Sequence, residues 1–239
     1  GEMGYPGALS APVWGFEDVL FKGDSLSLPQ PFETYVMENI LFKISFPAEF
    51  HAQTAVEAAV SLHSEIKDRI NEIESIEITT HESAIRIISK VGELNNPADR
   101  DHCLQYMVAI GLLKGNLVAE DYEDDVAKDP RVDELREKMI INEDKRYSKE
   151  YLEADKRSIA NRIKVHFKDG TATNEVEVEY PIGHRRRRKE GIPILEKKFK
   201  DNLSITYDES KSNEIFELCM DQRKLEETSV ADFQQLLSK

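Results

Sequence analysis

The chain has 239 residues, of which 40% are hydrophobic and 33% are charged, and its formal net charge is -14. This composition indicates a globular chain of one or two domains with a sizeable core. The negative charge argues against general affinity for nucleic acid or an anionic membrane, because binding to phosphate groups requires a concentrated positive field. No run approaches the roughly 20 apolar residues that cross a bilayer. We therefore expect no nucleic-acid partner and no membrane partner.

The two cysteines, Cys103 and Cys219, are too few to form an iron–sulfur cluster, which normally needs three or four thiolates. We expect the protein to use no cofactor and no metal. So few cysteines fit a reducing compartment, although two cysteines can in principle form a disulfide.

The first 30 residues predict a connecting segment. Residues 1–23 are rich in glycine and proline, which is typical of loop and a short helix. Residues 26–31 have the composition of a linker. Because the chain starts with a turn-rich run and no initiator methionine, we expect it to be part of a longer chain. Its scattered apolar anchors are Trp14, Phe16, Val19 and Leu20.

Two periodic patterns follow. Apolar residues alternate with others from Ile40 to Phe46, which predicts a strand that Pro47 closes. Apolar residues then recur every three or four positions, which predicts a long amphipathic helix that begins near Gln53. The residues of this apolar face are Ala55, Ala58, Ala59, Leu62, Ile66, Ile70 and Ile73.

Further strands are predicted from alternation. Residues 75–80 form a short strand, and residues 163–167 and 176–180 form a hairpin that turns at Asp169-Gly170. Lysines on one strand of the hairpin oppose glutamates on the other, which predicts cross-strand ion pairs worth a few tenths of a kcal/mol each.

The remaining segments complete an α+β fold. We predict a helix over residues 102–113, and we find no clear pattern in the acidic residues 119–155. Residues 31–190 are expected to form a small domain, similar to an α/β sandwich and with an antiparallel hairpin. Residues 191–239 are expected to be helical and to return to a larger all-α domain. The helical runs are 195–203, 213–225 and 230–237.

Several polar residues are candidates for binding or chemistry. Lys43 stands mid-strand between apolar residues, where an ammonium either reaches water along its apolar stem or binds a buried anion. His51 stands just before the predicted helix, where it can simply bond to backbone or water.

His102 and Tyr106 are four residues apart, so a helix would place them on one face. Imidazole and phenol can then transfer protons, although such pairs also occur in ordinary core helices. Arg100 can hold a carboxylate through two parallel hydrogen bonds, or can pair with Asp99 or Asp101. We interpret these two carboxylates mainly as helix caps.

The run from His184 to Lys189 contains four arginines and is like a nucleic-acid or nuclear-import patch. No aromatic residues interleave with it to stack bases. We expect its arginines to be solvated or to face acidic parts of the molecule.

Four stretches resemble the MmgE/PrpD family of dehydratases: residues 1–16, 42–55, 95–110 and 180–193. They are spread along the chain, so the resemblance spans nearly all of it. The resemblance implies that the chain is the carboxy-terminal half of a longer enzyme and that the α+β unit is a lid domain. It also implies that the absent amino-terminal helical half carries further active-site groups.

The resemblance gives roles to the candidates. It implies that Lys43, His102 and Tyr106 are catalytic and that Arg100 and His51 bind substrate. Gln53 is an alternative to His51 as the contact.

The activity implied is dehydration of 2-methylcitrate, a small tricarboxylate, to 2-methyl-cis-aconitate in the methylcitrate cycle of propionate breakdown, without metal or iron–sulfur cluster. One alternative is a decarboxylase of the same family that acts on cis-aconitate. Another is a non-enzymatic binding module whose basic loop contacts RNA. The resemblance further implies a homodimer of the full-length protein, little activity of this chain alone, and a mitochondrial location, or a cytoplasmic one in bacteria.

Overall fold

The computed structural model describes residues 7–28, 31–32 and 40–238. The first resembling residues, 1–6, and part of the predicted linker, 29–30, lie outside this range. The chain divides into two compact units, Gly1–Ile40 and Leu41–Lys239. The predicted boundaries at residues 30 and 190 stay predictions.

The first unit contains the predicted short helix, α1 (Phe16–Phe21), which has no buried residue. The four predicted apolar anchors are exposed; Trp14 has 85% of its surface accessible. The prediction that they anchor the segment is therefore wrong for this chain, because an exposed side chain contributes no core packing.

The second unit combines one mixed sheet with helices, as the α+β prediction requires. Its strands are β1 (Ile73–Thr80), β2 (Met139–Glu143), β3 (Asn161–Phe167) and β4 (Val176–Val178). Its α-helices are α3 (Gln53–Ile66), α4 (Glu82–Ile88), α5 (Pro97–Arg100), α6 (Leu104–Lys114), α7 (Asp124–Ala127), α8 (Pro130–Glu137), α9 (Lys145–Leu152), α10 (Arg188–Thr206), α11 (Glu209–Met220), α12 (Gln222–Glu227) and α13 (Val230–Leu237). Its short 3-10 helices are η1 (Phe50–Ala52), η2 (Ile70–Glu72), η3 (Ala119–Tyr122) and η4 (Arg185–Arg187).

The sheet has the strand order β2-β1-β3-β4. β1 pairs with β2 in parallel and with β3 in antiparallel, and β3 pairs with β4 in antiparallel. The predicted hairpin is confirmed as β3–β4. Its nearest charged pair is Arg162 with Glu175, at 3.3 Å, and not a lysine–glutamate pair.

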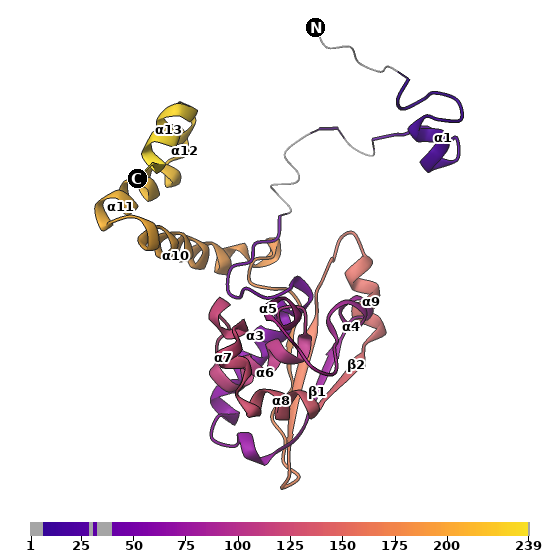
Figure 1. The fold of residues 1–239 in the computed structure, drawn as a ribbon, viewed down its shortest axis with the longest axis vertical. Helices are drawn as coiled ribbons and strands as arrows, with labels where there is room; N and C mark the ends of the chain where they lie inside the picture. Colours follow the sequence, from indigo (N-terminus) through magenta and orange to yellow (C-terminus); the bar gives the residue numbers. More distant parts are fainter. Residues whose placement is uncertain (1–6, 29–30, 33–39, 239) are drawn as a thin grey trace. The chain divides into compact units, whose positions relative to one another are not determined.

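One face of the sheet is buried under helices. Along β3, Ile163, Val165 and Phe167 are buried, and the residues between them are half-buried. α3 packs on β3 and β4, and α6 packs beside α3 (Figure 1). Gly111 allows this approach, because a Cβ atom there would lie 3.0 Å from the Ala59 Cβ atom. The core therefore lies between these two helices and the sheet.

The predicted strand over residues 40–46 is wrong. Ile44 and Phe46 are buried as the alternation requires, but the segment joins no sheet in the described residues. Its Phe42 N–H donates to the Gly183 carbonyl oxygen at 3.2 Å instead. The long helix that begins at Gln53 is confirmed, but it ends at Ile66. Ile70 and Ile73 belong to η2 and β1.

The carboxy-terminal helical runs are confirmed as α10 to α13. α10 already begins at Arg188 and contains Pro193, so the helix starts earlier than predicted. Both cysteines are free. No helix of the described residues is long and apolar enough to cross a membrane.

Candidate functional site

A cluster of polar side chains lies where β1 ends and where α3 and α4 begin. β1 ends at Thr80, and His81 follows it as the N-cap of α4. η1 leads into α3 and carries His51. The imidazole ring centroids of His51 and His81 are 5.1 Å apart, so the two segments meet there.

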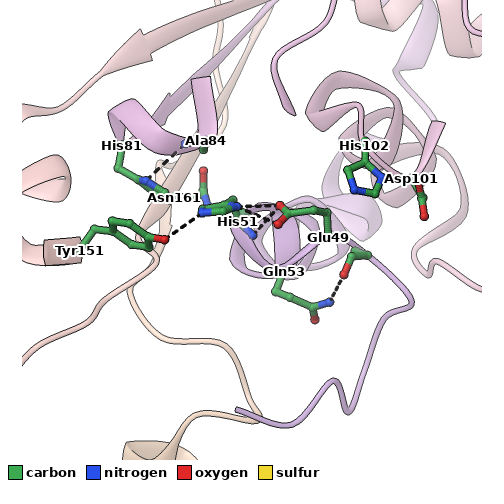
Figure 2. Close-up of polar contacts among 10 residues, drawn as sticks. Glu49, His51, Gln53, His81, Ala84, Asp101, His102, Tyr151 and Asn161 are labelled. Carbon is green, nitrogen blue, oxygen red and sulfur yellow. Dashed lines mark hydrogen bonds and ion pairs between the residues drawn. The ribbon is translucent and has the colours of Figure 1, made fainter. Parts of the chain in front are cut away.

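His51 bridges two partners through its two ring nitrogens (Figure 2). Its Nδ1 is 2.8 Å from the Glu49 Oε1 atom, and its Nε2 is 3.2 Å from the Tyr151 hydroxyl. Because a carboxylate only accepts hydrogen bonds, Nδ1 carries a proton, and Nε2 of the neutral ring accepts from the tyrosine. The Asn161 side chain donates to the His51 carbonyl at 2.9 Å and fixes the backbone.

Glu49 is an ionised partner of His51. Burial alone would raise the pKa of the Glu49 carboxyl, but the hydrogen bonds and charge attraction to His51 outweigh burial and lower it. His102 adds a weaker attraction, and in Figure 2 Glu49 lies between His51 and His102. The cluster therefore holds a negative charge that can stabilise an imidazolium.

His81 packs against the rings of His51 and Tyr151. It is fully buried, and its Nδ1 accepts a hydrogen bond from the Ala84 N–H at 3.4 Å. Its ring stacks on the Tyr151 ring, with centroids 4.7 Å apart and planes 14° apart. Burial, followed by repulsion from His51, lowers the pKa of His81 to about 4, so it is neutral at pH 7. A neutral ring can pack against Tyr151 at little cost.

Lys43 reaches the same region. Its ammonium lies 4.9 Å from the centroid of the Phe50 ring, and Phe50 stands between Glu49 and His51 in the chain. The Lys43 side chain is exposed, and its carbonyl oxygen accepts from Lys198 Nζ at 2.7 Å. Its ammonium is thus accessible to an anion from solution.

Gln53, the alternative contact, is buried in a structural position. Its Nε2 donates to the carbonyl oxygens of Phe46 and Ala48, at 2.9 and 2.8 Å. These bonds hold the chain that leads from Lys43 to Glu49.

His102 lies before α6 and not within it. α6 begins at Leu104 with Cys103 as its N-cap, so the predicted helical face shared by His102 and Tyr106 is wrong. The His102 side chain is 51% exposed, and its Nδ1 is 2.5 Å from Asp101 Oδ1. It remains accessible near Glu49.

Tyr106 lies in the core. Only 2% of its surface is exposed, and its hydroxyl donates to the Asp121 carbonyl oxygen at 2.6 Å. Burial raises the pKa of its phenol to about 12. This hydroxyl ties α6 to η3.

Arg100 is also buried, with 6% of its side chain exposed. Its Nη1 donates to the Tyr122 carbonyl oxygen at 2.6 Å, and its Nη2 is 2.8 Å from Asp124 Oδ1. Its acidic partner is therefore not one of the two predicted aspartates.

The predicted capping roles are wrong as well. Asn96 caps α5 by accepting from the Asp99 N–H, and Asp99 lies within that helix. Asp101 pairs with His102 and stands at the carboxy-terminal cap of α5, not at a helix start. An asparagine oxygen can accept from the free amides of a helix start as well as a carboxylate can.

The basic run is largely engaged within the molecule. Arg187 pairs with Glu57 at 2.8 Å and with Glu190 at 3.0 Å. Arg186 donates to the backbone carbonyl of Asp155. This fits the expectation that these arginines face acidic parts of the molecule.

Comparison with known proteins adds to this geometry. The model of the MmgE/PrpD C-terminal domain matches residues 46–222. The chain belongs to the MmgE/PrpD family. It is 56% identical over 98% of its length to a 2-methylcitrate dehydratase of Escherichia coli K12, of which it covers 49%. It is 56% identical over 90% of its length to a mitochondrial 2-methylcitrate dehydratase of Yarrowia lipolytica, of which it covers 42%.

A more distant relative is a 2-methylcitrate dehydratase-like protein of Aspergillus oryzae, 40% identical over 98% of this chain and 48% of its own length. The chain thus spans about half the length of the curated relatives it matches.

Three residues of this candidate site were not predicted from the sequence: Glu49, His81 and Tyr151. Glu49 was within reach, since it precedes His51 by two residues in the Pro-turn motif. His81 follows a predicted strand directly. Tyr151 has no local signal, because it lies 100 residues from His51 in a stretch without clear pattern.

Proposed function

We propose that the full-length protein dehydrates 2-methylcitrate to 2-methyl-cis-aconitate and water, in the methylcitrate cycle of propionate catabolism. The observation that carries the proposal is the 56% identity, over 98% of this chain, to an E. coli protein named 2-methylcitrate dehydratase. We further propose that the reaction needs no metal and no other cofactor. Among the described residues no group of three or more His, Cys, Asp or Glu side chains is placed to hold a metal ion.

Dehydration of 2-methylcitrate requires three kinds of chemical group. A trianionic substrate needs cations, the departing hydroxide needs an acid, and the carbon-bound proton needs a base. The exposed ammonium of Lys43 supports a role in holding a substrate carboxylate. The accessible His102 supports a role beside it. We also propose that His51 binds substrate, which requires one of its ring nitrogens to leave Glu49 or Tyr151.

Tyr106 and Arg100 can take part in the reaction only if each gives up a hydrogen bond or ion pair that it makes in this structure. We propose Tyr106, with His102, for proton transfer at the hydroxyl-bearing carbon. Tyr106 can act there only if its hydroxyl leaves the Asp121 carbonyl oxygen. Arg100 can bind a carboxylate only if it gives up Tyr122 or Asp124.

The proposal extends to the whole protein. The α+β unit would act as a lid over a helical domain, to which α10–α13 return, and the full-length protein would be a homodimer. Its location would be the mitochondrion, or the cytoplasm in a bacterium. Its partners would be small tricarboxylates, with no nucleic acid and no membrane. Size-exclusion chromatography with light scattering of the full-length protein tests the dimer.

The experiment that tests the function is an assay of the full-length protein with 2-methylcitrate and, separately, with cis-aconitate. We expect 2-methyl-cis-aconitate from the first substrate, identified by mass spectrometry. Release of carbon dioxide from cis-aconitate, without dehydration of 2-methylcitrate, would favour the decarboxylase. Salt-dependent RNA binding without turnover would favour the binding module.

Two variants test the assigned residues in the same assay. Lys43→Ala should raise KM strongly, because the carboxylate loses its cation. Tyr106→Phe should lower kcat if its hydroxyl transfers a proton. Near-normal turnover of both variants would remove these residues from the site.

A further inference from the structure

The proposed reaction requires a base that removes the carbon-bound proton, and none of the roles above supplies it. We propose that Tyr151 is this base and that His51 and Glu49 activate it. The inference rests on the proposed function, since it names the group that starts the same reaction.

Both ring nitrogens of His51 are already engaged. Nδ1 faces the Glu49 carboxylate at 2.8 Å, and Nε2 faces the Tyr151 hydroxyl at 3.2 Å. In this arrangement no ring nitrogen is left for a substrate. Within the Glu49–His51–Tyr151 hydrogen-bond chain, the phenol oxygen of Tyr151 keeps a lone pair that a substrate C–H group can approach. The Tyr151 side chain is only partly buried, so a ligand can reach it.

The Glu49 carboxylate, the His51 imidazole and the Tyr151 hydroxyl follow one another as in sites where a carboxylate and a histidine activate a hydroxyl group. In the forward step, the Tyr151 O–H bond breaks and its proton passes to His51 Nε2. The phenolate oxygen takes the proton from the substrate carbon, and the electron pair of that C–H bond forms the new carbon–carbon double bond. The hydroxyl group leaves as water with a proton from the acid. The imidazolium of His51 is balanced by Glu49. Tyr151 now carries the proton taken from the substrate, so when product leaves His51 gives its extra proton to solvent, and the acid that protonated the hydroxyl group takes one up.

Rigid elements hold Tyr151 in place. β2 pairs in parallel with β1 and leads directly into α9, where the Asp144 side chain caps the helix. The Asp144 N–H also donates to the Thr80 carbonyl oxygen at 2.9 Å. His81 then stacks on the Tyr151 ring from the β1 side. A base that must point at one carbon atom needs such support.

The other tyrosine of the proposed site lacks this arrangement. The Tyr106 hydroxyl donates to the backbone carbonyl oxygen of Asp121, which cannot take up a proton. Only a partner that binds the phenol proton can generate a base at neutral pH.

The test uses the full-length protein and the variant Tyr151→Phe, assayed with 2-methylcitrate and with the substrate deuterated at the reacting carbon. We expect kcat to fall by about 100-fold or more, with KM little changed. The primary isotope effect on kcat should rise, because proton removal becomes fully rate-limiting. Tyr207→Phe is the control. It also removes one hydroxyl bond, to the Leu237 carbonyl oxygen, and should leave kcat unchanged.

A second variant, His51→Asn, removes the proton acceptor and leaves Tyr151 in place. It should lower kcat to a similar level, and the double variant should be no worse than either single one, because the two residues act as a unit. If Tyr151→Phe does not fold, His51→Asn carries the test. Wild-type turnover of Tyr151→Phe would overturn the assignment of Tyr151 as the base. If only His51→Asn folds, wild-type turnover of that variant would overturn it. Either result would leave the proposed function standing. A wild-type protein without turnover would overturn both.

Discussion

Glu49 accepts two hydrogen bonds from His51: one from the ring Nδ1, at 2.8 Å, and one from the backbone N–H, at 2.8 Å. The second bond holds the carboxylate beside the ring. The ring is thereby fixed in one tautomer, with its Nε2 turned to Tyr151.

Replacing Glu49 by glutamine tests this relationship. The amide keeps the shape of the side chain but removes the charge that balances a protonated His51, so we expect kcat to fall by about 100-fold or more. Steady-state kinetics of the full-length protein measures the effect. Glu74→Gln, at an exposed position of β1, is the matched control. Equal kcat values for the two variants would show that the Glu49 charge is not used.

Arg100→Lys separates a structural role from substrate binding. A lysine cannot reach both the Tyr122 carbonyl oxygen and Asp124, so we expect the free energy of unfolding to fall by about 1–3 kcal/mol. KM for 2-methylcitrate should stay unchanged. Urea denaturation and kinetics of the same preparation measure both quantities. Unchanged stability together with a raised KM would show instead that Arg100 binds the substrate.

Because the pKa of His81 is lowered in the folded protein, we expect the protein to lose stability in acid. Its pKa is about 4 in the folded protein and 6.5 ordinarily, so between these values only the unfolded chain binds the proton. The stability contribution is complete above pH 6.5 and declines as the pH falls toward 4, by up to about 1.4 kcal/mol per pH unit for one proton. His81→Asn, which can still cap α4, should flatten this slope. Denaturant unfolding at several pH values measures it, and parallel slopes for the two proteins would refute the assignment.

Gly183→Ala should disturb the Lys43 segment. A Cβ atom at Gly183 would lie 1.7 Å from the Phe42 carbonyl oxygen, so the backbone next to Lys43 must move. If Lys43 holds a carboxylate, KM should rise more than kcat falls. Gly170→Asn is the control, at an open hairpin turn with φ +83 where asparagine is tolerated. A change in stability alone, with normal KM, would separate this segment from substrate binding.

Local patterns predicted the elements whose partners are close in the chain. The hairpin was predictable because both strands and the turn stand within 20 residues, with clear alternation. β2 was missed because its partner β1 lies about 60 residues away and its burial is only partial. The strand over residues 40–46 was predicted from alternation alone, but alternation does not supply a neighbouring strand, and the backbone there bonds to Gly183.

The site was predictable to a similar extent. His51 and Lys43 stand in one short motif and lie at the same end of α3. Tyr106 was predicted from its spacing to His102, but the helix starts between them and buries the phenol. Tyr151 approaches His51 only through the parallel pairing of β2 and the helix that follows it. Such contacts depend on the tertiary fold and leave no trace in local periodicity.

The most direct measurement is a crystal structure of the full-length protein with a bound tricarboxylate inhibitor. The proposed chemistry predicts one carboxylate within hydrogen-bond distance of Lys43 Nζ and the reacting carbon next to the Tyr151 hydroxyl. An inhibitor bound away from both Lys43 and the Glu49–His51–Tyr151 chain would contradict it.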